Sequence, residues 1–120
     1  MRYALLIYSD QEPWLELSEE EAAKRSEESL PKWYAFFEEL AKADPEMDSK
    51  ELDDIQTAKT VRVRDGEVMI TDGPFAETKE QIGGFFVANL PDLDTAISFA
   101  AKVPASEYGS IEVRPVVERG

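Results

Sequence analysis

The sequence predicts an α+β fold in which helices cover one face of a mostly antiparallel sheet. Runs typical of strands and helices follow one another in the order strand, helix, hairpin, strand, helix, strand, which is the order of a ferredoxin-like unit. The chain has 120 residues, the size of one ordinary domain, and its 42% hydrophobic and 32% charged residues are typical of a folded globular protein. We therefore expect residues 1–120 to form a single domain.

The first strand and the first helix have clear local signals. Tyr3–Tyr8 is a short apolar and aromatic run, the pattern of a strand buried on both faces at the centre of a sheet. A long helix should begin after Ser18, because Ser18 and Glu21 have capping-box spacing. Pro31 falls inside the helical pattern and should bend the helix or split it near Ser29. The expected apolar stripe of this helix consists of Leu30, Trp33, Phe37 and Leu40.

The middle of the chain predicts a loop followed by a hairpin. Asp44–Asp54 is rich in acidic residues and poor in bulky apolar ones, which is typical of a loop or a weakly ordered segment. Thr60–Arg64 then alternates between apolar and polar residues, and Glu67–Ile70 returns after a turn. The turn residues Asp65 and Gly66 favour the positive φ angles of a tight hairpin.

The last part of the chain predicts a strand, a helix and a final strand. Gly84–Leu90 is an apolar strand, and Asp92 can cap the helix that follows and that ends before Pro104. Ser110–Val117 alternates as a strand, and Pro115 within it indicates the edge of the sheet or a bulge. The apolar face of the second helix is expected to hold Leu93, Ala96, Ile97 and Ala100.

Composition excludes several classes of function. With 26 acidic against 13 basic residues the net charge is −13, and the basic residues are scattered, so nucleic acid and anionic membrane surfaces are poor partners. The chain has no cysteine and no histidine, which excludes disulfides, thiolate nucleophiles and imidazole bases. We expect no cofactor and no metal. The apolar run at Tyr3–Tyr8 is too short for a signal peptide or a membrane span, so we expect a cytoplasmic protein.

The leading candidate for a functional residue is Asp72, an acid in a Gly-Pro turn beside Phe75. Its competing role is structural, because Asp side chains also bind the backbone of their own turn. Glu77 and Lys79 can join Asp72 as an acid and a cation around a polar substrate, or serve only to solvate the loop. Arg62 lies on a strand, where it can point into a cleft or serve as an edge charge. The candidate ligand-binding set is Asp72, Gly73, Pro74, Phe75, Glu77, Lys79 and Arg62.

The segment around these candidates carries a family signature. Asp72-Gly73-Pro74-Phe75 is followed by Ala76-Glu77-Thr78-Lys79-Glu80, and this nine-residue segment with the residues around it resembles the DGPF group of YCII-related proteins over nearly the whole chain. The resemblance implies a homodimer in which two ferredoxin-like units form a dimeric α/β barrel, with the uncovered sheet faces packed together. Many relatives pair a histidine with an aspartate in the cleft. The matching aspartate here would be Asp72, and the histidine is missing.

The resemblance leaves two hypotheses about function. The first is a dimeric accessory module without catalytic activity that binds a small polar or aromatic ligand, or a protein partner, beside Asp72 and Phe75. The second is a cofactor-free lyase or isomerase with Asp72 as general base, Glu77 as acid and Lys79 as anion clamp. The missing histidine favours the binding module, because a carboxylate replaces an imidazole near neutral pH only after a large pKa shift.

Overall fold

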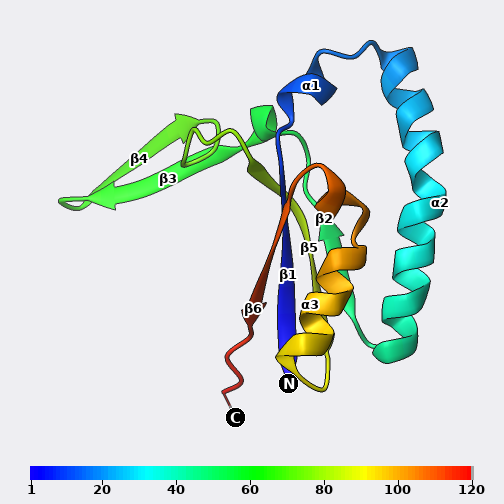
Figure 1. Ribbon diagram of the computed structural model, residues 1–120. Coiled ribbons are helices and arrows are strands. Elements are labelled where there is room, and N and C mark those ends of the chain that lie inside the picture. The colour runs from blue at the N-terminus through cyan, green and yellow to red at the C-terminus, as the bar shows by residue number, and fades with distance from the viewer. Residues whose placement is uncertain (120) are drawn as a thin grey trace.

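The computed structural model describes residues 1–119 and shows an antiparallel sheet, a separate hairpin and three α-helices (Figure 1). The strands are β1 (Arg2–Ser9), β2 (Asp48–Glu51), β3 (Lys59–Arg64), β4 (Glu67–Asp72), β5 (Gln81–Asn89) and β6 (Ser110–Pro115). The helices are α1 (Glu12–Leu15), α2 (Glu19–Ala43) and α3 (Leu93–Lys102), with 3₁₀ turns η1 (Ile55–Thr57) and η2 (Pro104–Glu107). The expected α+β class with an antiparallel sheet is confirmed.

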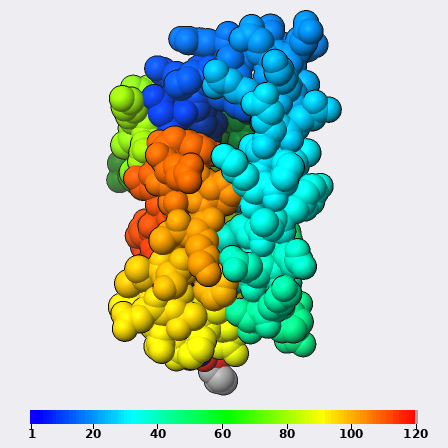
Figure 2. All heavy atoms as spheres, turned by 45° about the vertical axis from the view of Figure 1, so that its right-hand side comes forward, coloured from blue at the N-terminus to red at the C-terminus, as the bar shows by residue number. Residues whose placement is uncertain are grey.

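The main sheet has the strand order β2-β5-β1-β6, and every neighbouring pair is antiparallel. Strand β1 is therefore central, as its apolar sequence predicted, and β6 with Pro115 lies at an edge. The sheet stays open within one chain, so it closes no barrel by itself. In Figure 2, α2 and α3 lie side by side on one face of the molecule, and Lys102 of α3 is 3.6 Å from Glu39 of α2.

The core forms between the helices and one face of the sheet. Alternate residues of β1 and β5 are buried there, because successive side chains of a strand point to opposite faces. Phe86 of β5 is the centre of an aromatic cluster, with ring centroids 5.0 Å from Phe36 and 5.3 Å from Phe37. The buried hydrophobic residues are Tyr3, Leu5, Ile7, Phe36, Leu40, Phe86, Ala88, Leu90, Ala96, Ala100, Val103 and Ala105.

Helix α2 starts where the capping box predicts but does not split. The Ser18 hydroxyl accepts a hydrogen bond from the Glu21 amide at 3.1 Å and donates one to the Glu21 carboxylate at 3.0 Å. The helix then runs for 25 residues with Pro31 inside it. Of the two expected outcomes, a bend or a split near Ser29, the split is wrong, since packing of Phe36 and Leu40 beyond the proline holds one continuous helix together despite one missing hydrogen bond.

The prediction of a loop over Asp44–Asp54 is wrong, because β2 lies within it. Strand β2 pairs with β5 along one edge of the main sheet, with Asp48 opposite Val87 and Glu51 opposite Gly84. The backbones approach closely at Gly84, where an added Cβ would lie 2.8 Å from the Lys50 carbonyl oxygen. This strand depends on a partner more than thirty residues away, so its acidic sequence carries no local strand signal.

Two apolar residues of α3 are more exposed than its sequence predicted. Asp92 caps the helix by accepting a hydrogen bond from the Thr95 amide at 2.8 Å, as expected. Ala96 and Ala100 are buried, whereas Leu93 and Ile97 are about half exposed. The small alanines let α3 approach the sheet closely, which turns the larger side chains toward its flanks.

The hairpin of β3 and β4 forms at the predicted turn but joins no other sheet. Asp65 and Gly66 have φ angles of 51° and 79°, as a tight hairpin turn requires. The two strands form their own two-stranded sheet and project away from the main sheet (Figure 1). The hairpin with its turn, residues 59–72, is called the arm below.

Candidate functional site

A cavity of about 480 Å³ lies between α2 and one end of the main sheet. The sheet contributes residues from β1, β2 and β5, and the segment that follows β1 closes one side with α1. Its aromatic lining includes Trp14, Trp33, Phe37, Phe86 and Tyr108, whereas Phe85, which alternates with Phe86 along β5, has its ring on the opposite face of the sheet. A concave site of this volume with aromatic walls is suited to a small organic ligand.

Helix α2 builds one wall of the cavity from a single face. Ser26, Ser29, Leu30, Trp33 and Phe37 all line it and are spaced three or four residues apart, so they lie along one side of the helix. The Trp33 ring stacks on Phe86 with centroids 6.4 Å apart, which fixes the indole against the core. The Ser29 hydroxyl donates to the Ser26 carbonyl at 3.1 Å.

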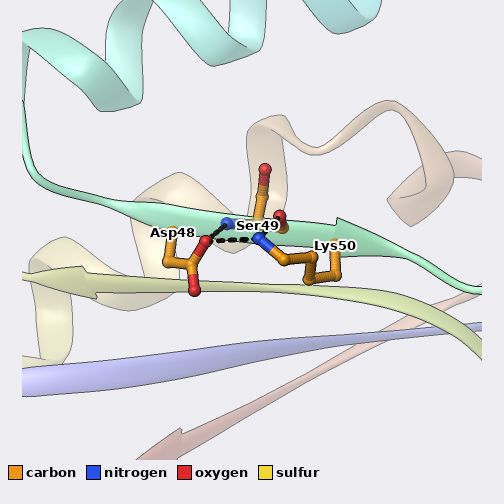
Figure 3. A network of polar contacts seen from close by, with 3 residues as sticks. All are labelled: Asp48, Ser49 and Lys50. Atoms are coloured by element: carbon orange, nitrogen blue, oxygen red, sulfur yellow. Dashed lines mark hydrogen bonds and ion pairs between the residues drawn. The ribbon is translucent and has the colours of Figure 1, made fainter.

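The polar part of the cavity is acidic. Asp10, Glu51 and Asp54 line it together with one basic residue, Lys50, and none of the three acids forms an ion pair with a described residue. The Lys50 ammonium instead donates to the Asp48 carboxylate at 2.8 Å, as Figure 3 shows.

Lys50 and Asp48 pair with each other on the face of β2 that points away from the core, because their register partners Phe85 and Val87 lie on the uncovered face of the sheet. The hydrogen bond from Lys50 and the Lys50 charge lower the pKa of Asp48 below its usual value, with a further contribution from the Ser49 amide. Asp48 stays ionised at neutral pH and offsets the lysine charge. The three remaining acids then give the cavity a negative potential.

The signature residues predicted to form the site lie outside this cavity. Asp72 ends β4 and pairs across the arm with Lys59, and its side chain is 86% exposed. Phe75 is 75% exposed, with the Arg62 guanidinium 5.3 Å from its ring centroid. Gly73 has a φ of 90° and donates its amide to the Ala58 carbonyl at 2.8 Å. The structure thus brings Arg62 and Phe75 together on one face of the arm, while Asp72 pairs with Lys59 on the other face at the base.

The rest of the signature forms a separate loop. Gln81 holds it by donating its side-chain amide to the Ala76 carbonyl at 2.6 Å and to the Thr78 carbonyl at 3.0 Å. Glu77 and Lys79 are exposed, and no hydrogen bond or ion pair joins either of them to Asp72 in the described part of the chain. Pro74 is half-buried beside Gly73.

Sequence reasoning missed the cavity because its aromatic residues were interpreted only as core. Trp33 and Phe37 are partly buried against the core and also line the cavity, so one side chain serves both. The available signal was the pair of serines at 26 and 29, which continue the apolar stripe of α2 toward its N-terminal end with small polar side chains. Trp14 in the short unpredicted helix α1 was a second signal.

The face of the sheet opposite the helices carries a second charged pair. Arg114 donates to the Glu112 carboxylate, and this hydrogen bond is the main cause that lowers the pKa of Glu112.

Within residues 1–119, no group of three or more acidic side chains is placed to hold a metal ion. None of the described helices combines the length and apolar character that a membrane crossing requires.

Comparison with known proteins identifies the family to which the chain belongs. Residues 1–119 match the YCII-related domain. The chain is also 36% identical over 118 residues to "Uncharacterized protein R00369" of Rhizobium meliloti (strain 1021), which covers 97% of this chain and 92% of the relative. Both matches extend over almost the full sequence, so they include α2, the cavity and the arm. The chain belongs to the YCII-related domain family.

Proposed function

We propose that this protein is a small-ligand-binding module that works as a homodimer, and that its ligand occupies the cavity between α2 and the sheet. The cavity of about 480 Å³ with its aromatic wall carries this proposal. A ligand with a flat apolar body would pack against Trp33 and Phe37, which the core already holds in place.

The charge of the cavity selects among such ligands. Asp10, Glu51 and Asp54 repel an anion, while Lys50 is already paired with Asp48. These carboxylates attract a cationic nitrogen on the ligand, and the faces of the aromatic rings also attract it through cation–π contacts. The proposed ligand class is therefore an aromatic or aliphatic amine, with neutral aromatic compounds next.

The homodimer is supported by the face of the sheet that no helix covers. Ala4, Leu6, Phe85 and Val87 alternate with core residues, so they share this face, and register places Leu6 beside Phe85 and Ala4 beside Val87. The strand order β2-β5-β1-β6 is that of a ferredoxin-like unit, in which a second copy can cover this apolar face and close a dimeric α/β barrel.

The signature supports a closer family assignment as part of the same proposal. Asp72-Gly73-Pro74-Phe75 and the residues after it support membership of the DGPF group, and we propose a cytoplasmic location.

The alternative function is a cofactor-free lyase or isomerase that uses Asp72 for proton transfer. Asp72 has less support as a general base, because it is exposed, pairs with Lys59 and does not line the cavity. A ligand site for this alternative would lie near the turn at Gly73, where Asp72 pairs with Lys59 on one face of the arm and Arg62 lies over Phe75 on the other.

A thermal-shift screen of amines, neutral aromatics and carboxylates on matched variants tests the proposal. Ser29→Trp fills the cavity, whereas Glu28→Trp places the same side chain on an exposed position next to it. A ligand at 100 times its Kd adds about 2.7 kcal/mol to stability, which raises Tm by several degrees.

We expect amine hits on the wild type and Glu28→Trp that Ser29→Trp loses. Hits that survive Ser29→Trp but disappear in Asp72→Asn would move the site to the signature and refute the cavity. Hits confined to carboxylates would refute the ligand class.

A further inference from the structure

The arm carries an apolar face that stays more than half exposed among residues 1–119. Register pairs Val61 with Ile70 and Val63 with Val68, and these four side chains lie on one face of the hairpin. Each is between 58% and 66% exposed. The opposite face is mostly polar and consists of Thr60, Arg62, Arg64, Glu67, Met69 and Thr71.

The arm is anchored to the body only at its base. The Thr60 hydroxyl donates to the Gly73 carbonyl at 2.8 Å, and Arg62 lies over Phe75 on the polar side. Along the described chain, β3 and β4 pack extensively only against each other. An isolated two-stranded hairpin is marginally stable in water, and its two outer edges are open to pairing. An exposed row of four aliphatic side chains on such an element is the pattern of a contact surface.

We propose that the arm packs its aliphatic face, Val61, Val63, Val68 and Ile70, against a second copy of this chain. This inference rests on the homodimer of the proposed function and adds a second contact to it. The arm and the uncovered sheet face would then form one interface, since the arm leads directly through the signature loop into β5.

The surface area of the chain supports a second copy of the chain as the partner that covers the arm. The accessible surface is 8755 Å², against about 6,500 Å² for a compact monomer of 13.5 kDa, an excess of roughly 2,200 Å². The radius of gyration is 16.5 Å, against about 13.6 Å for a compact chain of this length. A standard interface buries roughly 800 Å² on each partner, so the excess suits a larger, obligate interface that includes the arm.

Charge also favours a copy of the same chain. Residues 59–72 contain three basic side chains, Lys59, Arg62 and Arg64, and three acidic ones, Asp65, Glu67 and Asp72, so the arm is neutral. The whole net charge of −13 therefore lies on the rest of the chain. A neutral arm can approach an acidic copy without the repulsion that the two bodies impose on each other.

Sedimentation velocity on three glutamate variants tests the arm. Val68→Glu places a carboxylate on the aliphatic face, Met69→Glu places the same charge on the opposite face of the arm, and Val87→Glu places it on the uncovered sheet face. We expect Val68→Glu to weaken the dimer roughly 100-fold or more, because an unpaired carboxylate would be buried, and Met69→Glu to weaken it by less than about threefold.

The outcomes separate this inference from the proposed function. A dimer that Val87→Glu dissociates but Val68→Glu leaves intact would refute the arm and retain the homodimer. A wild type that is monomeric at micromolar concentration would refute both. Equal effects of Val68→Glu and Met69→Glu would also count against the arm.

A second measurement covers the case in which Val68→Glu does not fold. The chain has no cysteine, so Glu67→Cys at the arm tip takes a single nitroxide label. This nitroxide-labelled chain, without ¹⁵N, is mixed with a ¹⁵N-labelled chain that carries no nitroxide. The proposed contact should broaden amide signals in the body of the ¹⁵N chain. A ¹⁵N spectrum without such broadening would refute the proposed contact.

Discussion

Pro31 lies in the middle of α2, between residues that line the cavity. Its side chain is exposed, and it follows Ser29 and Leu30 and precedes Trp33. As a proline it donates no hydrogen bond to the Glu27 carbonyl, and its ring crowds the preceding turn. We predict that Pro31→Ala stabilises the fold, because it restores this hydrogen bond and relieves the crowding.

The magnitude follows from helix propensity. Proline in a helix interior is about 3 kcal/mol less favourable than alanine. A helix that has already relaxed around the proline recovers only part of this, so we expect a gain of about 1 to 3 kcal/mol, or a rise in Tm of several degrees. The helix should also straighten and shift Leu30 and Trp33 against the sheet, so an amine that fits the wild-type cavity should bind Pro31→Ala more weakly.

Urea unfolding followed by circular dichroism measures the stability change. Lys32→Ala is the matched control, since it alters an exposed neighbour on the same helix and should change stability by less than about 0.5 kcal/mol. A Pro31→Ala variant that is no more stable than Lys32→Ala would refute the reasoning. It would show that packing around Pro31 is lost in the variant and that this loss offsets the restored hydrogen bond.

Three further predictions address the core, a helix cap and the edge strand. Leu40→Ala should cost about 2 to 5 kcal/mol in urea unfolding, because Leu40 is fully buried, and a loss below about 1 kcal/mol would contradict this. The hydrogen bonds from Thr95 lower the pKa of Asp92 below 3.8, so its charge stabilises the fold above about pH 4 and loses that effect as the pH falls through the lowered pKa. The Tm difference between wild type and Asp92→Asn should therefore shrink from pH 7 to pH 2, and a constant difference would argue against it. Gly84→Ala should weaken hydrogen-exchange protection of β2, since the new Cβ meets the Lys50 carbonyl, and unchanged protection would contradict that close approach.

Local physics let the sequence determine several elements by itself. The capping box at Ser18, the cap at Asp92 and the positive φ angles of Asp65 and Gly66 each depend on a few neighbouring residues, and all formed as predicted. The central position of β1 also agreed with its apolar run, which is typical of a strand inside a sheet. The family could be inferred from the signature that begins at Asp72 for a different reason, the specificity of a nine-residue match.

Tertiary structure decided where the hollow and exposed surfaces lie. Strand β2 pairs closely with β5 at Gly84, where a side chain would clash with the Lys50 carbonyl. The cavity lies where Trp33 packs on Phe86 and the small side chains of Ser26 and Ser29 line the same wall. The alternation of β3 and β4 predicted their pairing but not that Val61 and Val68 would face away from their own chain. Such features depend on long-range contacts, which periodicity along the sequence does not encode. The cavity and the exposed position of the arm could therefore be identified only from the tertiary structure.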